Sequence, residues 1–270
     1  MYLFRKEKLI SSQGTIYIVA SQAPVDGASN SFVEKYLSHH FIYCNLAGFT
    51  PLSLLEHYRE MARCYKRWYG PFLPEDRDAW ILDIGCGMGH FLYFLKKEGY
   101  RNFLGVDISR EQVNFVRKYI TDKVVEADAF TFLEGAPFQF DVIVMNDFLE
   151  HIPKVRVLSF LSLVYRSLKE NGKVFVKTIN AANPFNLRAR YMDFTHETAY
   201  TEHSLAQVLR ASGFKIIALF GDYCPGSSVR GYLNNIIRKV FLLMIRKMFI
   251  LQGIPPPNIL DKNIIAIASK

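Results

Sequence analysis

Cysteine, tryptophan and long uninterrupted apolar segments are scarce in this chain. Its 270 residues include four cysteines and two tryptophans, and no two cysteines form a CxxC pair. The cysteines also lack histidines at the spacing that a zinc site needs. Neither a disulfide framework nor a structural metal is therefore indicated, and a reducing cytoplasm is the expected compartment.

No apolar segment resembles an export signal or a convincing membrane span. The run Thr15–Ala20 follows basic residues but is too short for the core of a signal peptide. A longer apolar run at residues 231–253 is interrupted by the basic pairs Arg238-Lys239 and Arg246-Lys247. Such interruptions disfavour a transmembrane helix, although the segment still reads as a basic amphipathic helix.

Charge and composition limit the possible ligands and the class of protein only broadly. The chain has 33 lysines and arginines against 25 acidic residues, for a formal net charge of +8. This positive field is compatible with nucleic acid, anionic lipid or phosphorylated substrates and selects none of them. With 50% hydrophobic and 21% charged residues, the composition is that of an ordinary soluble protein, and the length suggests one domain with additions.

From residue 80 onward, short apolar runs alternate with segments of helical periodicity. This alternation is typical of βαβ units and a parallel sheet. We expect an α/β fold with a Rossmann-like, doubly wound, seven-stranded and mostly parallel sheet, covered by helices on both faces. The last two strands are expected to pair as a hairpin that carries a long insertion. The expected strands are Trp80–Ile84, Phe103–Asp107, Lys123–Ala127, Phe140–Met145, Lys173–Ile179, Phe214–Phe220 and Asn263–Ser269.

Turn and capping signals place the helices between these strands. Thr50, Ser109 and Thr201 each precede a helical pattern and are good N-cap residues. Asn171-Gly172 is expected to end the long helix that starts after Pro153.

These signals suggest four parts. They are an N-terminal extension with a hairpin near Tyr17 and a helix expected to cover a cleft of the core (1–79), a core (80–230), a basic amphipathic helical insertion (231–258) and the last core strand (259–270).

A glycine-rich turn, Asp-Ile-Gly-Cys-Gly-Met-Gly, joins the first strand of the core to its helix. Glycines allow a tight turn and the close approach of a ligand to the backbone. A dinucleotide-binding turn needs its third glycine one residue later, where this chain has His90, so that interpretation fits less well.

Polar side chains follow the next three strands at the points where each strand ends. Asp107 ends the second strand, Asp128 follows the third, and Asn146-Asp147 follows the fourth. Open α/β sheets bind ligands at these carboxyl ends, where a carboxylate accepts hydrogen bonds from ribose hydroxyls or an adenine amine.

With this turn and these acids, residues 80–180 resemble the core of class I S-adenosylmethionine-dependent methyltransferases. The resemblance implies that S-adenosylmethionine is the cofactor, with its methionine end near Gly85 and its adenine between Ile108 and Ala129. Another doubly wound nucleotide-binding domain remains the alternative. The cofactor-binding residues implied are Asp83, Gly85, Cys86, Gly87, Gly89, Asp107, Ile108, Asp128, Ala129, Asn146, Asp147 and Phe148.

Two histidines are candidates for the chemistry. His151 follows the fourth strand, where it is placed to act as a general base oriented by Glu150 or Asp147, or simply to close the turn. His196 lies in an Asp-Phe-Thr-His segment that resembles one in bacterial methyltransferases acting on sugars or polysaccharide precursors. It is therefore a candidate acceptor-side residue, with a turn residue bonded to backbone as the alternative.

The leading hypothesis is an O-methyltransferase that acts on a sugar, polysaccharide-related or lipid-linked glycan acceptor and uses no metal. In one alternative, a metal-assisted RNA 2′-O-methyltransferase, a divalent cation is bound by Asp147, Glu150, His151 and His196. This segment resembles in part the metal site of small-RNA 2′-O-methyltransferases. Nucleic acid is not favoured because no RNA-binding module is recognisable.

A third hypothesis is a non-catalytic S-adenosylmethionine-binding protein with a membrane or protein partner. The helix at 231–253 would lie on the inner membrane surface, on its own core, or on a second subunit in a homodimer.

Overall fold

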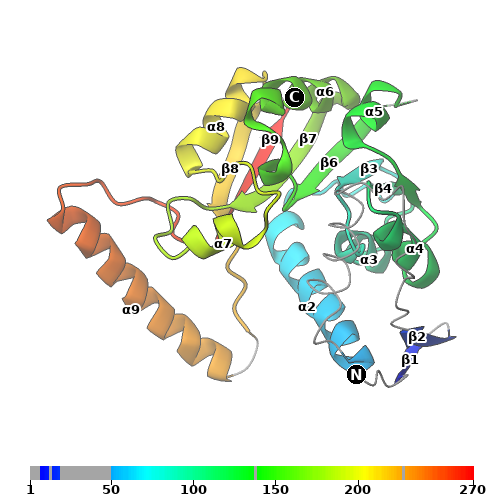
Figure 1. Ribbon diagram of the computed structural model, residues 1–270, viewed down its shortest axis with the longest axis horizontal. Coiled ribbons are helices and arrows are strands. Elements are labelled where there is room, and N and C mark those ends of the chain that lie inside the picture. The colour runs from blue at the N-terminus through cyan, green and yellow to red at the C-terminus, as the bar shows by residue number, and fades with distance from the viewer. Residues whose placement is uncertain (1–6, 12–13, 19–49, 137–138, 227–228) are drawn as a thin grey trace, which may run out of the picture.

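The computed structural model describes residues 7–11, 14–18, 50–136, 139–226 and 229–270, and its centre is a seven-stranded sheet (Figure 1). The strand order is β5-β4-β3-β6-β7-β9-β8. Its members are β3 (Ile81–Ile84), β4 (Phe103–Asp107), β5 (Val124–Glu126), β6 (Phe140–Asn146), β7 (Leu168–Ile179), β8 (Lys215–Gly221) and β9 (Asn263–Ser269).

Neighbouring strands are parallel from β5 to β7, and β9 runs antiparallel to both β7 and β8. The doubly wound sheet predicted from the sequence is therefore confirmed, including the final hairpin pair. A second, separate hairpin joins β1 (Glu7–Ser11) to β2 (Gly14–Ile18), as predicted near Tyr17. The order of the large sheet reverses between β4-β3 and β6-β7, which creates a crevice at their carboxyl ends.

Helices cover both faces of the sheet, and each face has its own apolar core. On one face lie α2 (Pro51–Tyr69), α3 (His90–Lys97) and α4 (Arg110–Tyr119). On the other lie α5 (Ala129–Glu134), α6 (Val157–Ser167) and α8 (Glu202–Ala211). The short elements η2 (Leu149–His151), η3 (Lys154–Arg156) and α7 (Leu187–Met192) border the carboxyl edge, and α9 (Val229–Leu251) projects from the body.

The three predicted N-caps are present. Thr50 and Thr201 each accept a hydrogen bond from a backbone N–H three residues later, at 3.2 Å in both helices. Ser109 does the same at the start of α4, at 3.4 Å. Such caps satisfy backbone donors that have no partner inside the helix, so these residues determine where the three helices begin.

The predicted end of α6 at Asn171-Gly172 is wrong. The helix ends at Ser167, and β7 already begins at Leu168. Leu168 is extended and fully buried, and it pairs with Phe140 on β6, so burial of this side chain draws the chain out of the helix early. Asn171, with φ of 61°, instead lies where the pairing between β6 and β7 shifts register.

Among the described residues, no helix has both the length and the apolar character needed to cross a membrane.

Close packing beneath the glycine-rich turn predicts a measurable stability effect at Gly105 in β4. A Cβ atom at this position would lie 2.6 Å from Leu92 Cδ1 and 2.9 Å from Cys86 Sγ. We expect Gly105→Ala to lower the free energy of unfolding by about 1–3 kcal/mol, as overpacked cores do. Urea denaturation measures this, with Gly135→Ala as the control, because its Cβ would meet only Thr131 O at 3.6 Å. Equal midpoints for the two variants would contradict the prediction.

Candidate functional site

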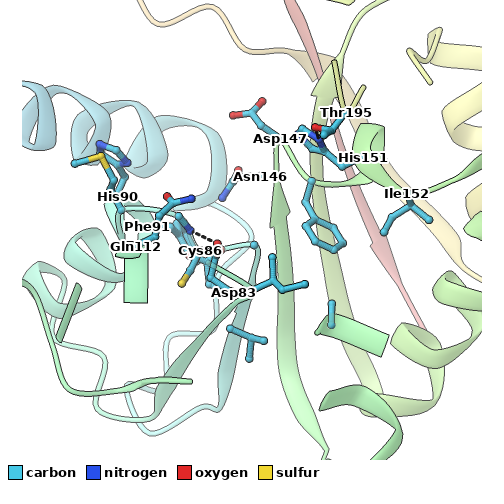
Figure 2. Close-up of a pocket in the computed structure, with 18 of the residues that line it drawn as sticks. Asp83, Cys86, His90, Phe91, Gln112, Asn146, Asp147, His151, Ile152 and Thr195 are labelled. Carbon is cyan, nitrogen blue, oxygen red and sulfur yellow. Dashed lines mark hydrogen bonds between the residues drawn. The ribbon is translucent and has the colours of Figure 1, made fainter. Parts of the chain in front are cut away.

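A cavity of about 750 Å³ opens at the carboxyl ends of β3, β4 and β6, where the strand order reverses (Figure 2). This size is within the range of small-molecule sites. Leu54, His57 and Tyr65 of α2 also line the cavity.

The glycine-rich turn forms the floor of the cavity. Gly85 has φ of 67°, and a Cβ there would lie 2.5 Å from Cδ2 of the Phe148 ring. Gly87 has φ of 52°. Both positions therefore require glycine, the first because of backbone conformation and contact together, and the second because of conformation.

Asp107 joins the end of β4 to this turn. Its Oδ2 accepts a hydrogen bond from Gly87 N at 2.8 Å, and its Oδ1 accepts one from Ser109 N at 2.9 Å. The side chain also lines the cavity. These two bonds fix the orientation of the carboxylate beside the glycine-rich turn.

Three buried polar atoms around the cavity have no hydrogen-bond partner among the residues that the structure describes. They are Asp83 Oδ1, His90 Nε2 and Asn146 Nδ2, from β3, α3 and β6. Burial, followed by the nearby Asp107 carboxylate, raises the pKa of Asp83 well above its usual value. Burial lowers the pKa of His90 to about 3, so its ring is neutral. Unpartnered buried polar groups are costly, and their convergence on one cavity indicates a site for a polar ligand.

A hydrogen-bonded chain orients His151 at the other end of the cavity. His151 Nδ1 lies 2.8 Å from Thr195 Oγ1, and Thr195 Oγ1 donates its proton to Asp193 Oδ1 at 2.8 Å. Because the hydroxyl has one proton and gives it to the carboxylate, it must accept from His151 Nδ1–H. When the ring is neutral, this bond places its proton on Nδ1 and its lone pair on Nε2.

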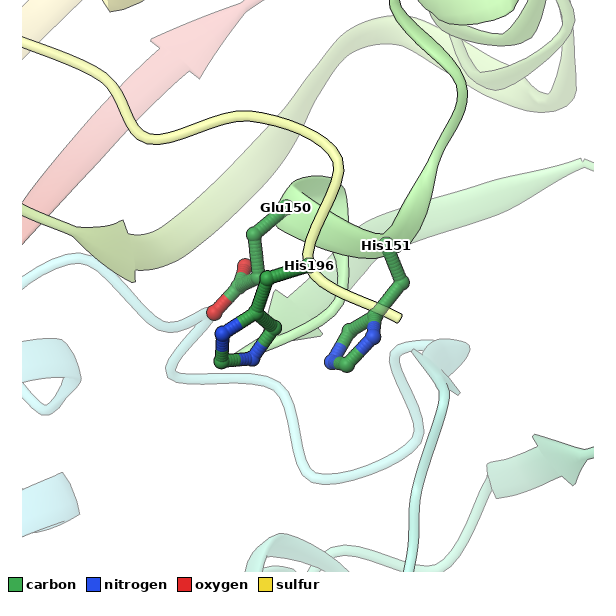
Figure 3. Close-up of side chains that lie close together, drawn as sticks. All are labelled: Glu150, His151 and His196. Atoms are coloured by element: carbon green, nitrogen blue, oxygen red, sulfur yellow. The ribbon is translucent and has the colours of Figure 1, made fainter. Parts of the chain in front are cut away.

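Glu150 and His196 lie beside His151 (Figure 3). The rings of His151 and His196 are 4.7 Å apart, and one ligand atom from each of the three residues lies within 4.8 Å of the others. Burial, followed by the Asp147 charge, raises the pKa of Glu150 to about 8, and its Oε2 accepts a hydrogen bond from Thr178 Oγ1 at 2.9 Å. His196 Nδ1 lies 3.0 Å from Ala189 O, a pairing that requires a proton on Nδ1.

Most of the predicted site residues meet at this cavity. Two do not line it. Gly89 faces α4, where a Cβ would lie 3.0 Å from Val116 Cγ2, so its role is the close approach of two helices. His196 packs behind His151. The predicted residues that line the cavity are Asp83, Gly85, Cys86, Gly87, Asp107, Ile108, Asp128, Ala129, Asn146, Asp147, Phe148 and His151.

Like Asp107, other residues of this set also have hydrogen bonds within the protein, and Asn146 Oδ1 accepts one from Tyr69 OH at 2.6 Å. Asp128 caps α5, accepting from Thr131 N at 3.0 Å. Asp147 accepts from Lys177 Nζ at 2.5 Å.

The sequence interpretation missed His57, His90, Gln112 and Thr195 as individual lining residues. Gln112 lies on α4 beside Gly87. The sequence predicts that it is helical but not that its side chain points toward the cavity. Thr195 was part of the noted Asp-Phe-Thr-His segment, but no local signal joined it to His151.

Comparison with known proteins agrees with this geometry. A family model described as a methyltransferase domain matches residues 55–219, more than half of the chain. An uncharacterized protein from Rickettsia prowazekii is 29% identical over 167 residues, which cover 59% of this chain and 67% of that protein. A ubiquinone biosynthesis O-methyltransferase from Pseudomonas aeruginosa is 32% identical over 105 residues, covering 37% of this chain. This match spans 44% of that enzyme, less than half of its length.

A solved structure gives a longer match. The crystal structure of a SAM-dependent methyltransferase from Archaeoglobus fulgidus is 25% identical and superposes with a TM-score of 0.60, covering 81% of this chain and 99% of that one. The family match, the sheet order and the cavity at the strand ends agree, and the chain belongs to the methyltransferase domain family.

Proposed function

We propose that this protein is an S-adenosylmethionine-dependent O-methyltransferase that methylates a hydroxyl group. The cavity offers groups that complement the cofactor. Asp83 Oδ1 is a buried acceptor in need of a donor, which the ammonium of the methionine end would supply. Asp107 lies at the next strand end, where its carboxylate would accept from the ribose hydroxyls.

The proposal of a hydroxyl acceptor depends on one observation, the hydrogen-bonded chain from Asp193 through Thr195 to His151. With Nδ1 protonated, His151 Nε2 takes the proton of the acceptor hydroxyl as the oxygen attacks the methyl carbon. An O–CH₃ bond forms while the S–CH₃ bond breaks, and the sulfonium leaves as a neutral thioether. The base is needed because a neutral alcohol is a weak nucleophile.

We propose a sugar or polysaccharide-related hydroxyl as the acceptor, carried on a lipid. Polar groups suited to such a hydroxyl line the cavity, namely His151, Asp193 and Arg156. Met192 and Phe194 beside them are 70% and 81% exposed, and they offer an apolar surface to the non-polar part of a lipid-linked molecule. A phenolic hydroxyl, as the name of the Pseudomonas relative suggests for that enzyme, is the competing acceptor.

The experiment supplies purified protein and CD₃-labelled S-adenosylmethionine to a bacterial cell extract that has been separated into lipid, soluble and RNA fractions. We expect mass spectrometry to find the label as an O–CD₃ ether on a glycan in the lipid fraction. Label on a nitrogen or carbon atom would overturn O-methylation, and label on a phenol would overturn only the glycan acceptor. A sample heated before incubation controls for uncatalysed methylation.

Thr195→Val tests the orienting chain separately. Valine keeps the shape of threonine but cannot accept from His151 Nδ1–H, so the tautomer is no longer fixed. We expect kcat to fall by about tenfold, as for the loss of one orienting hydrogen bond, with little change in S-adenosylmethionine affinity. Thr195→Ser, which retains the hydroxyl, should keep most of the activity. Equal activity of the valine and serine variants would contradict the role of the chain.

A second candidate is metal-assisted methylation, for which RNA 2′-hydroxyls are the alternative acceptor. The observation that favours it is the grouping of Glu150, His151 and His196 around one point. Here the histidine Nε2 atoms would bind a divalent cation that lowers the pKa of the acceptor hydroxyl. Chelator-treated protein that keeps full activity and binds no Mn²⁺ in calorimetry would reject this candidate. A non-catalytic role is disfavoured because one cavity joins the glycine-rich turn to His151.

A further inference from the structure

Helix α9 attaches to the body along one side. Ile245 is buried, Arg238 forms an ion pair with Asp261, and Arg246 donates to Asn258 O at 2.7 Å. At 100° per residue, these three side chains lie on the same side of the helix. The ion pair and the hydrogen bond together set the orientation of α9 on the protein.

The opposite side of α9 is an exposed apolar stripe. Its members recur at helical spacing and span an arc of about 80° centred almost opposite Ile245, Arg238 and Arg246. Each is at least 54% exposed. They are Leu233, Ile237, Val240, Met244, Met248 and Leu251, and we call them the α9 stripe.

The charge on α9 has one sign. Residues 229–251 contain five lysines and arginines and no acidic residue. Lys239 and Lys247 are exposed. At 100° per residue, Lys247 borders the α9 stripe, whereas Lys239 lies about 100° beyond its edge, beside Arg246. Two α9 helices paired along their stripes would bring like charges together, whereas a surface of negative charge would complement them.

Exposed apolar side chains extend from α9 toward the cavity. Phe241 of α9 contacts Phe185, with ring centroids 5.5 Å apart, and α7 follows Phe185 in the chain. Figure 1 shows α7 on the side of the body nearest α9. Beyond α7, Phe194 is 81% exposed and lies between Asp193 and Thr195, which line the cavity. The apolar surface therefore leads to the end of the cavity that holds His151.

We propose that α9 lies in the headgroup region of an anionic membrane, with the α9 stripe among the acyl chains and Lys247 at the phosphates. An interfacial helix has this combination of an apolar face, basic flanks and insufficient apolar length to span. Docking in this way turns the apolar surface beside the cavity toward the bilayer. The acceptor would then be a lipid-borne molecule, and this last step alone rests on the proposed function.

Vesicle sedimentation tests the docking without cofactor or acceptor. The full-length protein is mixed at low salt with vesicles of phosphatidylglycerol and phosphatidylcholine, or of phosphatidylcholine alone. We expect strong binding to the anionic vesicles and weak binding to the neutral ones. Ile237→Asn with Met244→Asn should reduce partitioning at least about tenfold, because two large apolar side chains are lost from the membrane. Val155→Asn with Leu158→Asn, at exposed positions 93% and 49% accessible, should not.

The lysines give an independent readout. Lys247→Ala should weaken binding to anionic vesicles by about fivefold, and raised salt should remove this difference. Lys239→Ala, which lies farther from the stripe, should have a smaller effect. The proposal is overturned if the protein stays in solution with anionic vesicles. It is also overturned if light scattering shows a dimer that the stripe variant dissociates while vesicle binding is unchanged. Neither result bears on the labelled-methyl assay, so failure of docking and failure of O-methylation are distinguishable.

Discussion

Replacing His151 with alanine is expected to lower kcat by about a hundredfold to ten-thousandfold, the range that a positioned general base contributes. The reason is the fixed tautomer, in which Thr195 accepts from Nδ1–H and leaves the lone pair on Nε2. Alanine removes the imidazole that this chain orients. The affinity for S-adenosylmethionine should change little, because the acids proposed to bind it, Asp83 and Asp107, lie on β3 and β4, whereas His151 lies on η2.

Initial-rate kinetics and calorimetry separate these effects. His203→Ala is the matched control, because the His203 side chain is 89% exposed and is not among the cavity-lining residues. A His151→Ala enzyme with wild-type kcat would remove His151 from the chemistry. A parallel loss of cofactor affinity would instead assign it a structural role in shaping the cavity.

The fold could be predicted because its signals are local. The strands are short apolar runs, and the caps at Thr50, Ser109 and Thr201 satisfy backbone groups within their own helices. The cofactor end of the cavity was predictable for a related reason. In a parallel sheet all carboxyl ends meet at one edge, so polar residues that follow successive strands must converge there, as Asp83 and Asp107 do.

The acceptor end depends on contacts that no local pattern carries. His151 and Thr195 are 44 residues apart, and β7 and α7 lie between them in the chain. They meet because backbone N–H groups of Glu197 and Thr198 both donate to Glu150 O, which ties the second histidine segment to the first. The predicted position of the α6 C-terminus was wrong for a similar reason. Burial of Leu168 against β6 outweighed the local turn signal at Asn171.

Replacing Asp107 with alanine is expected to weaken S-adenosylmethionine binding by at least about tenfold, since each hydrogen bond to a charged group contributes about 1.5–3 kcal/mol. Two losses combine. The ribose hydroxyls would lose their carboxylate, and Gly87 N and Ser109 N would lose the acceptors that hold the glycine-rich turn in place. Calorimetric titration with S-adenosylmethionine measures the change directly.

A matched control distinguishes the loss of a cofactor contact from a non-specific effect of removing an acidic side chain. Asp122→Ala removes an exposed acid that precedes β5, at the opposite edge of the sheet, and should leave the affinity unchanged. Asp107→Asn keeps one acceptor oxygen but places an amide N–H group against a backbone N–H, so an intermediate affinity is expected. If all three variants bind S-adenosylmethionine like the wild type, the cofactor does not lie at this strand end. The proposal for Asp83 would then fail with it, because both acids line the same cavity.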